Sequence, residues 1–135
     1  MPMKGGCYCG AVRYEIKAKP VFKAQCHCRA CQSFSGGGAN IFMAVPRQGF
    51  AYTEGEIQSY RKDAPDAVAS REFCPDCGVQ LVSRRDGLDL VMVKVGTLDD
   101  PAAFKGPKAA IYTAEKQGFH FIPDTLPSFE GFPPV

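Results

Sequence analysis

Seven cysteines stand in three tight clusters, and this residue type at this spacing indicates metal chemistry. The clusters are Cys7-Tyr8-Cys9, Cys26-His27-Cys28-Arg29-Ala30-Cys31 and Cys74-Pro75-Asp76-Cys77-Gly78. An odd number of cysteines cannot pair completely in disulfides, whereas seven divides into four plus three. Four thiolates complete a tetrahedral zinc site, and three leave one coordination position open, as catalytic zinc sites do.

The first and third clusters together predict a structural zinc site, whose ligands would be Cys7, Cys9, Cys74 and Cys77. The third cluster is a C-x-x-C turn, and Gly78 can supply the positive φ that such a turn needs. In an extended segment residues i and i+2 share one face, so both sulfurs of the first cluster can reach one ion. Pairing these two clusters rests on the middle one having three cysteines of its own. The alternative is disulfides or simple buried thiols.

The middle cluster predicts a catalytic zinc site formed by Cys26, Cys28 and Cys31. A strand end that leads into a turn would bring all three sulfurs to one ion, and thiolate-rich sites select zinc over harder cations. The fourth position could then take water, a substrate thiolate or a substrate oxygen. Three thiolates leave a formal charge of −1 on the site, which suits exchange of a soft ligand such as a thiol. A second structural site or a labile regulatory site is the alternative.

The polar neighbours of the middle cluster are candidates for supporting roles. Because His27 stands between two ligands, we expect it to point away from them, to the surface or behind the site, with general acid or base duty as an alternative. His120, which Phe119 and Phe121 flank in the sequence, is expected to be a packing histidine. Three further side chains could hold a polar or anionic substrate, or could be solvated loop residues: Arg29, Gln32 and Ser33.

Length and charge narrow the class of protein. The chain has 135 residues, and we expect one domain over 1–135 with an irregular tail over 123–135. A net charge of +2 with scattered basic residues indicates neither a nucleic-acid nor a membrane partner. The first six residues lack an apolar segment, and no apolar run approaches the roughly 20 residues of a membrane span. These features predict a cytoplasmic protein, where thiols stay reduced.

The elements that must position the cysteines are predicted to be short strands, so the fold class is mainly β, with few or no long helices. Fourteen glycines and eleven prolines indicate many turns. Asp86-Gly87 between two apolar segments predicts a hairpin, and its second strand is apolar on both faces, which predicts a central position. Strands are expected at 12–17, 21–25, 40–45, near 52, and at 57–60, 79–84, 88–95 and 109–113, and residues 68–73 lead into the third cysteine cluster.

Three other segments are predicted to be irregular or helical only briefly. Residues 32–40 form an expected glycine-rich loop after the middle cysteine cluster. Residues 99–104 could make a single helical turn with an acidic N-cap. From Pro123 onward, the prolines predict a tail without regular structure that lies over the surface.

The order C-x-C, C-x-C-x-x-C and C-x-x-C-G resembles the glutathione-dependent formaldehyde-activating enzyme family, which has a zinc-bearing β-tent fold. The resemblance covers nearly the whole chain. It rests on GCYCGAV at 6–12, CHCRACQ at 26–32, FCPDCG at 73–78, VGTLDDP at 95–101, and IPD and LPSFEG in the tail. One departure is Ala110-Ile111-Tyr112, where many members carry a His-Ile-Trp-like stretch, and this chain has no tryptophan. We expect this change to alter the pocket.

The resemblance implies a zinc-dependent carbon–sulfur lyase that joins formaldehyde to the thiol of glutathione and gives S-hydroxymethylglutathione. It implies two zinc ions per chain: a structural ion on Cys7, Cys9, Cys74 and Cys77, and a catalytic ion on the other three cysteines. The expected partners are a small-molecule thiol and a small aldehyde. The alternative is a non-catalytic zinc module that binds a protein partner or handles metal. The count of zinc ions per chain, two against one, discriminates these two functions.

Overall fold

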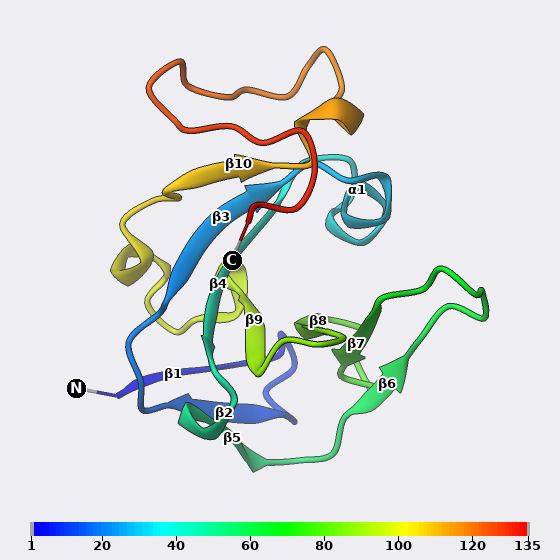
Figure 1. Cartoon of the computed structure of the whole chain (residues 1–135). Helices are drawn as coiled ribbons and strands as arrows, with labels where there is room; N and C mark the ends of the chain where they lie inside the picture. The colour runs from blue at the N-terminus through cyan, green and yellow to red at the C-terminus, as the bar shows by residue number, and fades with distance from the viewer. Residues whose placement is uncertain (1, 135) are drawn as a thin grey trace.

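A computed structural model of the chain describes residues 2–134, so the first and last residues of the expected domain, 1 and 135, lie outside the described part. Two β-sheets form most of the structure, and within this range the only α-helix has seven residues (Figure 1). The mainly β class is therefore confirmed. No helix of the described chain is both long and apolar enough to cross a membrane.

The smaller sheet is antiparallel and has three strands in the order β1-β2-β5. The bounds are Met3–Gly6 for β1, Arg13–Ile16 for β2 and Phe50–Glu54 for β5. Tyr14 and Ile16 are buried while their neighbours are half-buried, which is the period-2 pattern of a strand with one face in the core.

The larger sheet has seven strands in the order β10-β3-β4-β9-β8-β7-β6. The hairpin predicted around Asp86 is present as β8 and β9, and β9 takes the central place that its apolar sequence predicts. Only β10 runs parallel to its neighbour, β3. The bounds are Phe22–Cys26 (β3), Asn40–Pro46 (β4), Gln58–Tyr60 (β6), Ala69–Phe73 (β7), Gln80–Arg85 (β8), Leu90–Lys94 (β9) and Ala109–Ile111 (β10).

The two faces of the larger sheet have different coverings. One face packs against the smaller sheet around a core that includes Tyr14, Ile16, Met43, Val45 and Val93. The opposite face has a second apolar cluster, which is partly covered by residues of the C-terminal tail. Figure 1 shows the tail, in red, crossing near β3 and β4. Strand pairing therefore creates one closed face and one face available for a site.

The helix α1 (Arg29–Ser35) corrects the prediction of a loop over 32–40. Cys28 acts as its N-cap, because its sulfur accepts a hydrogen bond from the Cys31 amide at 3.2 Å. The helix ends at Gly36, which adopts the left-handed conformation with φ of 81°. The glycines predict a loop over all of residues 32–40, whereas they mark only the end of the helix.

Four short 3₁₀ helices join the strands, and one of them tests the predicted turn. η3 (Pro101–Phe104) confirms the helical turn and has the acidic residue Asp100 at its N-cap, although the Asp100 side chain makes no capping hydrogen bond. The other three are η1 (Arg47–Gly49), η2 (Val95–Thr97) and η4 (Thr113–Glu115).

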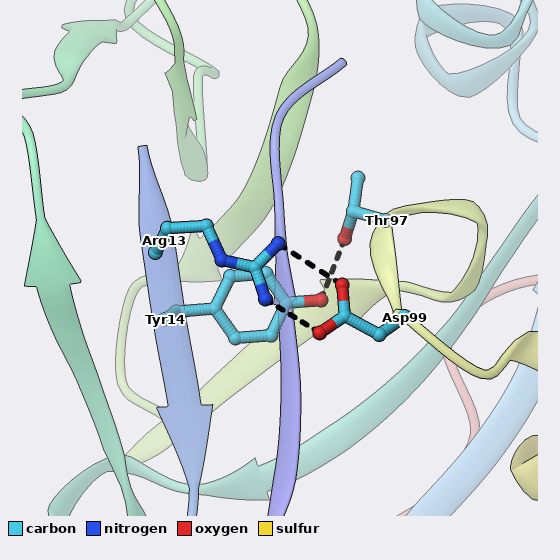
Figure 2. Close-up of polar contacts among 4 residues, drawn as sticks. All are labelled: Arg13, Tyr14, Thr97 and Asp99. Atoms are coloured by element: carbon cyan, nitrogen blue, oxygen red, sulfur yellow. Dashed lines mark hydrogen bonds and ion pairs between the residues drawn. The ribbon is translucent and has the colours of Figure 1, made fainter. Parts of the chain in front are cut away.

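Asp99 instead connects the end of the larger sheet to the smaller one. Its carboxylate accepts two hydrogen bonds from Arg13, with Nη1–Oδ1 at 3.0 Å and Nη2–Oδ2 at 2.5 Å (Figure 2). Beside this pair, the Tyr14 hydroxyl lies 2.7 Å from Thr97 Oγ1. Both contacts join β2 to the segment that follows β9, so they fix the smaller sheet against the core.

The tail has the predicted irregular conformation and is held by backbone hydrogen bonds. The Ala110 amide donates to the Pro127 carbonyl, and the Phe129 amide donates to the Ala110 carbonyl, each at 2.9 Å. These bonds give β10 an irregular outer neighbour, with a single parallel bridge between Ala110 and Ser128. The tail thereby covers the edge of the sheet next to the middle cysteine cluster.

Candidate metal centres and substrate cavity

The structure brings the first and third cysteine clusters together. The sulfurs of Cys7, Cys9, Cys74 and Cys77 all lie within 4.8 Å of one another, and we call this group the four-cysteine site. Two of the distances are 3.6 Å and 3.8 Å. Tetrahedral Zn–S bonds of about 2.3 Å place sulfurs about 3.8 Å apart, so the donor set fits a zinc ion. All seven cysteines of the chain are free thiols.

Two turns shape the four-cysteine site, one at the end of each sheet. The turn between β1 and β2 directs the Val12 amide at the Cys7 sulfur, 3.2 Å away, and this hydrogen bond favours the thiolate. In the turn between β7 and β8, Gly78 has the predicted positive φ, of 78°. The amide of Val79 is the main cause that lowers the pKa of Cys77 to about 6. A Cβ at Gly5 would clash with the Thr97 carbonyl, so the close approach of β1 requires glycine.

The middle cluster forms a second group on the opposite face of the larger sheet, and we call it the three-cysteine site. Cys26 ends β3, Cys28 caps α1 and Cys31 lies in the first turn of that helix. Their sulfurs also lie within 4.8 Å of one another, so the donor set fits a thiolate-binding metal with three protein ligands. The expected strand end is present, but a helix start rather than a plain turn brings the third sulfur close.

The three thiols do not share charge equally. Hydrogen bonds from the thiols of Cys26 and Cys31 lower the pKa of Cys28 to about 2, and the positive charge of Arg71 adds a smaller effect. The pKa of Cys26 is raised, mainly by its hydrogen bond to Cys28. The site is thus arranged so that negative charge first resides on Cys28, the most exposed of the three sulfur ligands.

His27 is buried behind the three-cysteine site, which is one of the two positions expected for it. Its side chain is 1% exposed and lies outside the residues that line the adjacent cavity. Gln25 donates to its Nε2 at 3.0 Å, and its Nδ1 lies 2.9 Å from Nδ1 of His120. Burial is the main cause that lowers the pKa of His27, so the ring is neutral near pH 7.

His120 packs edge-on against the Phe119 ring, with the ring centroids 5.1 Å apart, and also completes this network. The flanking Phe119 and Phe121 are exposed, whereas Nε2 of His120 lies 2.8 Å from the Gly37 carbonyl oxygen. Because Gln25 donates to Nε2 of His27, the network assigns the proton of His27 to Nδ1, which donates to Nδ1 of His120. His120 then carries its own proton on Nε2, which donates to the Gly37 carbonyl oxygen. These hydrogen bonds connect β3, the glycine turn after α1 and the loop that precedes the tail.

A cavity of about 360 Å³ opens over the three-cysteine site, and we call it the cysteine cavity. It lies on the open face of the larger sheet, where strand register aligns Met92 with Ser83, Ser83 with Arg71 and Ala69 with Arg85. Ile111 and Tyr112 also line the cavity, so the expected departure from the family pattern falls in the pocket. Tyr112 has φ of 54°, a strained conformation for a bulky residue at a candidate site.

Two arginines in the cavity wall carry positive charge toward the thiols. Arg71 stacks on the Phe34 ring of α1, with its guanidinium carbon 4.3 Å from the ring centroid, and Arg85 stacks on Phe132 of the tail at 4.1 Å. In the part of the chain that the structure describes, neither makes an ion pair. Asp66 and Glu115 lie at the same cavity, and Glu115 already accepts a hydrogen bond from the Arg29 amide at 2.9 Å.

The polar residues that the sequence singled out near the site have different roles. Gln32 is buried and donates to the carbonyls of His27 and Glu115, so it supports the loop and does not face substrate. Arg29 reaches Gln32 at 2.6 Å, and Ser33 donates to the Arg29 carbonyl. None of these three lines the cavity within residues 2–134. The arginines of β7 and β8 were not recognised, because they approach the site only through strand pairing.

The sequence profile of the glutathione-dependent formaldehyde-activating enzyme family matches residues 2–115, which include all three cysteine clusters. The chain belongs to this family. A Penicillium rubens protein named for the same family is 29% identical over 124 residues, which cover 84% of this chain. The chain spans 63% of the length of that relative.

The fold also has a counterpart among solved structures. A crystal structure of a Rhodobacter sphaeroides protein superposes with a TM-score of 0.63 at 22% sequence identity. The match covers 78% of this chain and 97% of that protein. At this identity the likeness supports the arrangement of the strands alone.

Proposed function

We propose that the protein is a zinc-dependent carbon–sulfur lyase that joins formaldehyde to glutathione and gives S-hydroxymethylglutathione. The observation that carries the proposal is the position of the three-cysteine site at a cavity with two arginines that lack carboxylate partners among residues 2–134. Family membership supplies the reaction. We further propose that residues 1–135 act as one domain in the cytoplasm.

Two zinc ions per chain would have separate duties. Cys7, Cys9, Cys74 and Cys77 would hold a structural ion, since four protein thiolates leave no position for substrate. Cys26, Cys28 and Cys31 would hold a catalytic ion with one position open. The chemistry that zinc supplies when bound is stabilisation of a substrate thiolate or polarisation of a small aldehyde.

The residues of the cavity would bind and orient glutathione. Arg71 and Arg85 stand where they can each pair with a carboxylate of the tripeptide, and planar guanidinium groups suit such two-point contacts. Stacking on Phe34 and Phe132 limits the freedom of both side chains before substrate arrives. Met92, Ile111 and Phe132 provide apolar wall that excludes water from the reacting carbon.

Replacing the ligand nearest the solvent tests the proposal directly. Cys28→Ser is expected to lose one of two zinc ions, and with it the accelerated exchange between glutathione and its formaldehyde adduct. Elemental analysis gives the zinc count, and NMR exchange spectroscopy gives the rate. Ser33→Ala, an exposed change on the same helix, is the control that should keep both. Full turnover by Cys28→Ser would refute the catalytic site.

Arg71→Gln should raise the KM for glutathione by about tenfold or more, since a hydrogen bond to a charged group contributes about 1.5–3 kcal/mol. The rate at saturating thiol should change little. Turnover with 2-mercaptoethanol, a thiol without carboxylates, should be unaffected. Arg61→Gln is the matched control, because Arg61 pairs with Asp86 away from the cavity. An equal loss with both thiols would contradict the binding role.

The alternative of a non-catalytic zinc module predicts a different result in the same experiments. Such a module needs only the four-cysteine site, so the protein would hold one zinc ion and show no accelerated exchange. Two zinc ions together with glutathione-dependent exchange would exclude it.

A further inference from the structure

A second cavity, of about 470 Å³, lies beside the cysteine cavity, and we call it the apolar cavity. Its volume is within the range of small-molecule sites, about 300–1,000 Å³. Phe22 and Ala44 contribute from β3 and β4, Leu88 and Leu90 from the β9 side, and Phe129 from the tail. No charged side chain of residues 2–134 lines it. Neither glutathione nor formaldehyde has an apolar group that would use such a space.

The two cavities are continuous along one face of the larger sheet. They share three wall residues, Phe42, Met92 and Phe132. Strand register puts Phe22 opposite Ala44 and Ala44 opposite Met92. Along β3 and β4 this row is followed by the pair of Ala24 with Phe42 and then by the pair of Cys26 with Asn40, so the apolar cavity leads toward the three-cysteine site. This face of the larger sheet is therefore lined by charged groups and thiols at one end and by apolar side chains at the other.

Phe132 lies at the boundary between the two cavities and lines both of them. Its ring stacks on Arg85 at 4.1 Å and lies 6.4 Å from the Tyr112 ring. Phe132 reaches this place through the irregular tail, not through a strand of the sheet, and it is half-buried. One of the three wall residues that the cavities share is thus carried by an irregular segment outside the strands.

From this arrangement we propose that the apolar cavity receives the carbon chain of an aliphatic aldehyde larger than formaldehyde. The inference rests on the proposed function, because the reacting carbon must lie at the three-cysteine site. The thiol sulfur forms a bond to the aldehyde carbon, the carbonyl π electrons move to its oxygen, and the thiol proton is transferred to that oxygen. The product is a hemithioacetal, and no oxidant or reductant takes part.

S-alkylglutathiones test this directly, because their thioether mimics the adduct and cannot dissociate to aldehyde. Titration calorimetry on the zinc-loaded protein should compare glutathione, S-methylglutathione and S-hexylglutathione. Each buried methylene contributes about 0.8 kcal/mol, which corresponds to roughly fourfold in affinity. Burial of part of the hexyl chain should therefore make S-hexylglutathione bind at least about tenfold more tightly than S-methylglutathione.

Leu90→Ser should remove most of this advantage and leave the affinity for S-methylglutathione unchanged, because Leu90 lines only the apolar cavity. Ile41→Ser is the matched control: Ile41 lies on β4, is 44% exposed and lines neither cavity. The control should keep the full preference for the hexyl compound.

Each alternative outcome has a distinct meaning. Equal affinity of the methyl and hexyl compounds for the unchanged protein would overturn the inference and leave the proposed function standing. Failure of glutathione and both derivatives to bind would overturn the proposed function and this inference with it. A hexyl group without effect, together with a dimer that Leu90→Ser dissociates in sedimentation, would assign the cavity to a second copy of the chain and overturn the inference.

Discussion

His27 and His120 connect three segments behind the three-cysteine site, and their hydrogen bonds are made out of reach of the cavity. His120→Ala would leave Nδ1–H of His27 and the Gly37 carbonyl without partners. An unsatisfied buried group costs about 1–3 kcal/mol, so we expect a loss of that size in the free energy of unfolding. Urea unfolding of the zinc-loaded protein measures it.

A neighbouring aromatic residue provides the control for that change. Phe121 is 80% exposed, so Phe121→Ala should change the free energy of unfolding by less than about 0.5 kcal/mol although it removes a larger side chain. Equal stability of His120→Ala and the unchanged protein would show that the histidine pair has no structural role.

Single residues were predictable from the sequence where the local pattern alone determines their role. The grouping of seven cysteines as four and three, and the positive φ of Gly78, follow from spacing within short segments. The roles of Arg71 and His120 were not predicted, because the partners that define them, Phe34 and His27, are 37 and 93 residues away in the chain. The only signal for His120 was a second histidine in a chain that has two.

Low pH should weaken the contact between β2 and the segment after β9. The Arg13 guanidinium, through its hydrogen bonds, holds the pKa of Asp99 below its ordinary value. The stabilisation is therefore present above the unfolded pKa, about 3.9, and is lost as pH falls through the lowered folded value. Asp99→Asn should reduce the free energy of unfolding at pH 7 by about 0.2–1 kcal/mol, since both side chains are partly exposed.

The comparison across pH distinguishes the ion pair from other effects of that substitution. The difference between Asp99→Asn and the unchanged protein should shrink below pH 4, and release of metal by acid affects both proteins alike. Glu56→Gln, at an exposed carboxylate outside the ion pairs of residues 2–134, is the control. A difference that stays constant from pH 7 to pH 3 would mean that the Asp99 charge contributes nothing.

Strands were easier to predict than their partners. Alternation and turn residues placed eight of the strands, including the central β9, within a few residues of their observed bounds. The sequence did not predict the helix α1, because its N-cap is a cysteine and the role of a metal ligand already accounted for that residue. The sequence also did not indicate that β5 and β6 belong to different sheets, since sheet membership depends on long-range pairing.

At the scale of the whole molecule, the four-cysteine site brings together a turn of the smaller sheet and a turn of the larger one. Cys7 and Cys74 both belong to the core between the sheets. Structural zinc contributes about 10–16 kcal/mol to folding, as much as the total stability of many domains. Cys74→Ser should therefore give insoluble or unfolded protein, as judged by soluble yield and circular dichroism.

The same measurement on Cys28→Ser separates the two sites. Loss of a ligand at the three-cysteine site removes no connection between the sheets, so that variant should stay soluble and cooperative in unfolding. A folded, soluble Cys74→Ser protein with one zinc ion would contradict the structural role of the four-cysteine site.

The position of the C-terminal residues has a practical consequence for purification. Pro133 and Pro134 form part of the wall of the apolar cavity, while β1 lies in the other sheet, against the opposite face. An affinity handle fused next to Pro134 would begin at the rim of that cavity and compete with whatever enters it. A handle fused next to Pro2 avoids this interference, so the kinetic constants of the two fusions should differ.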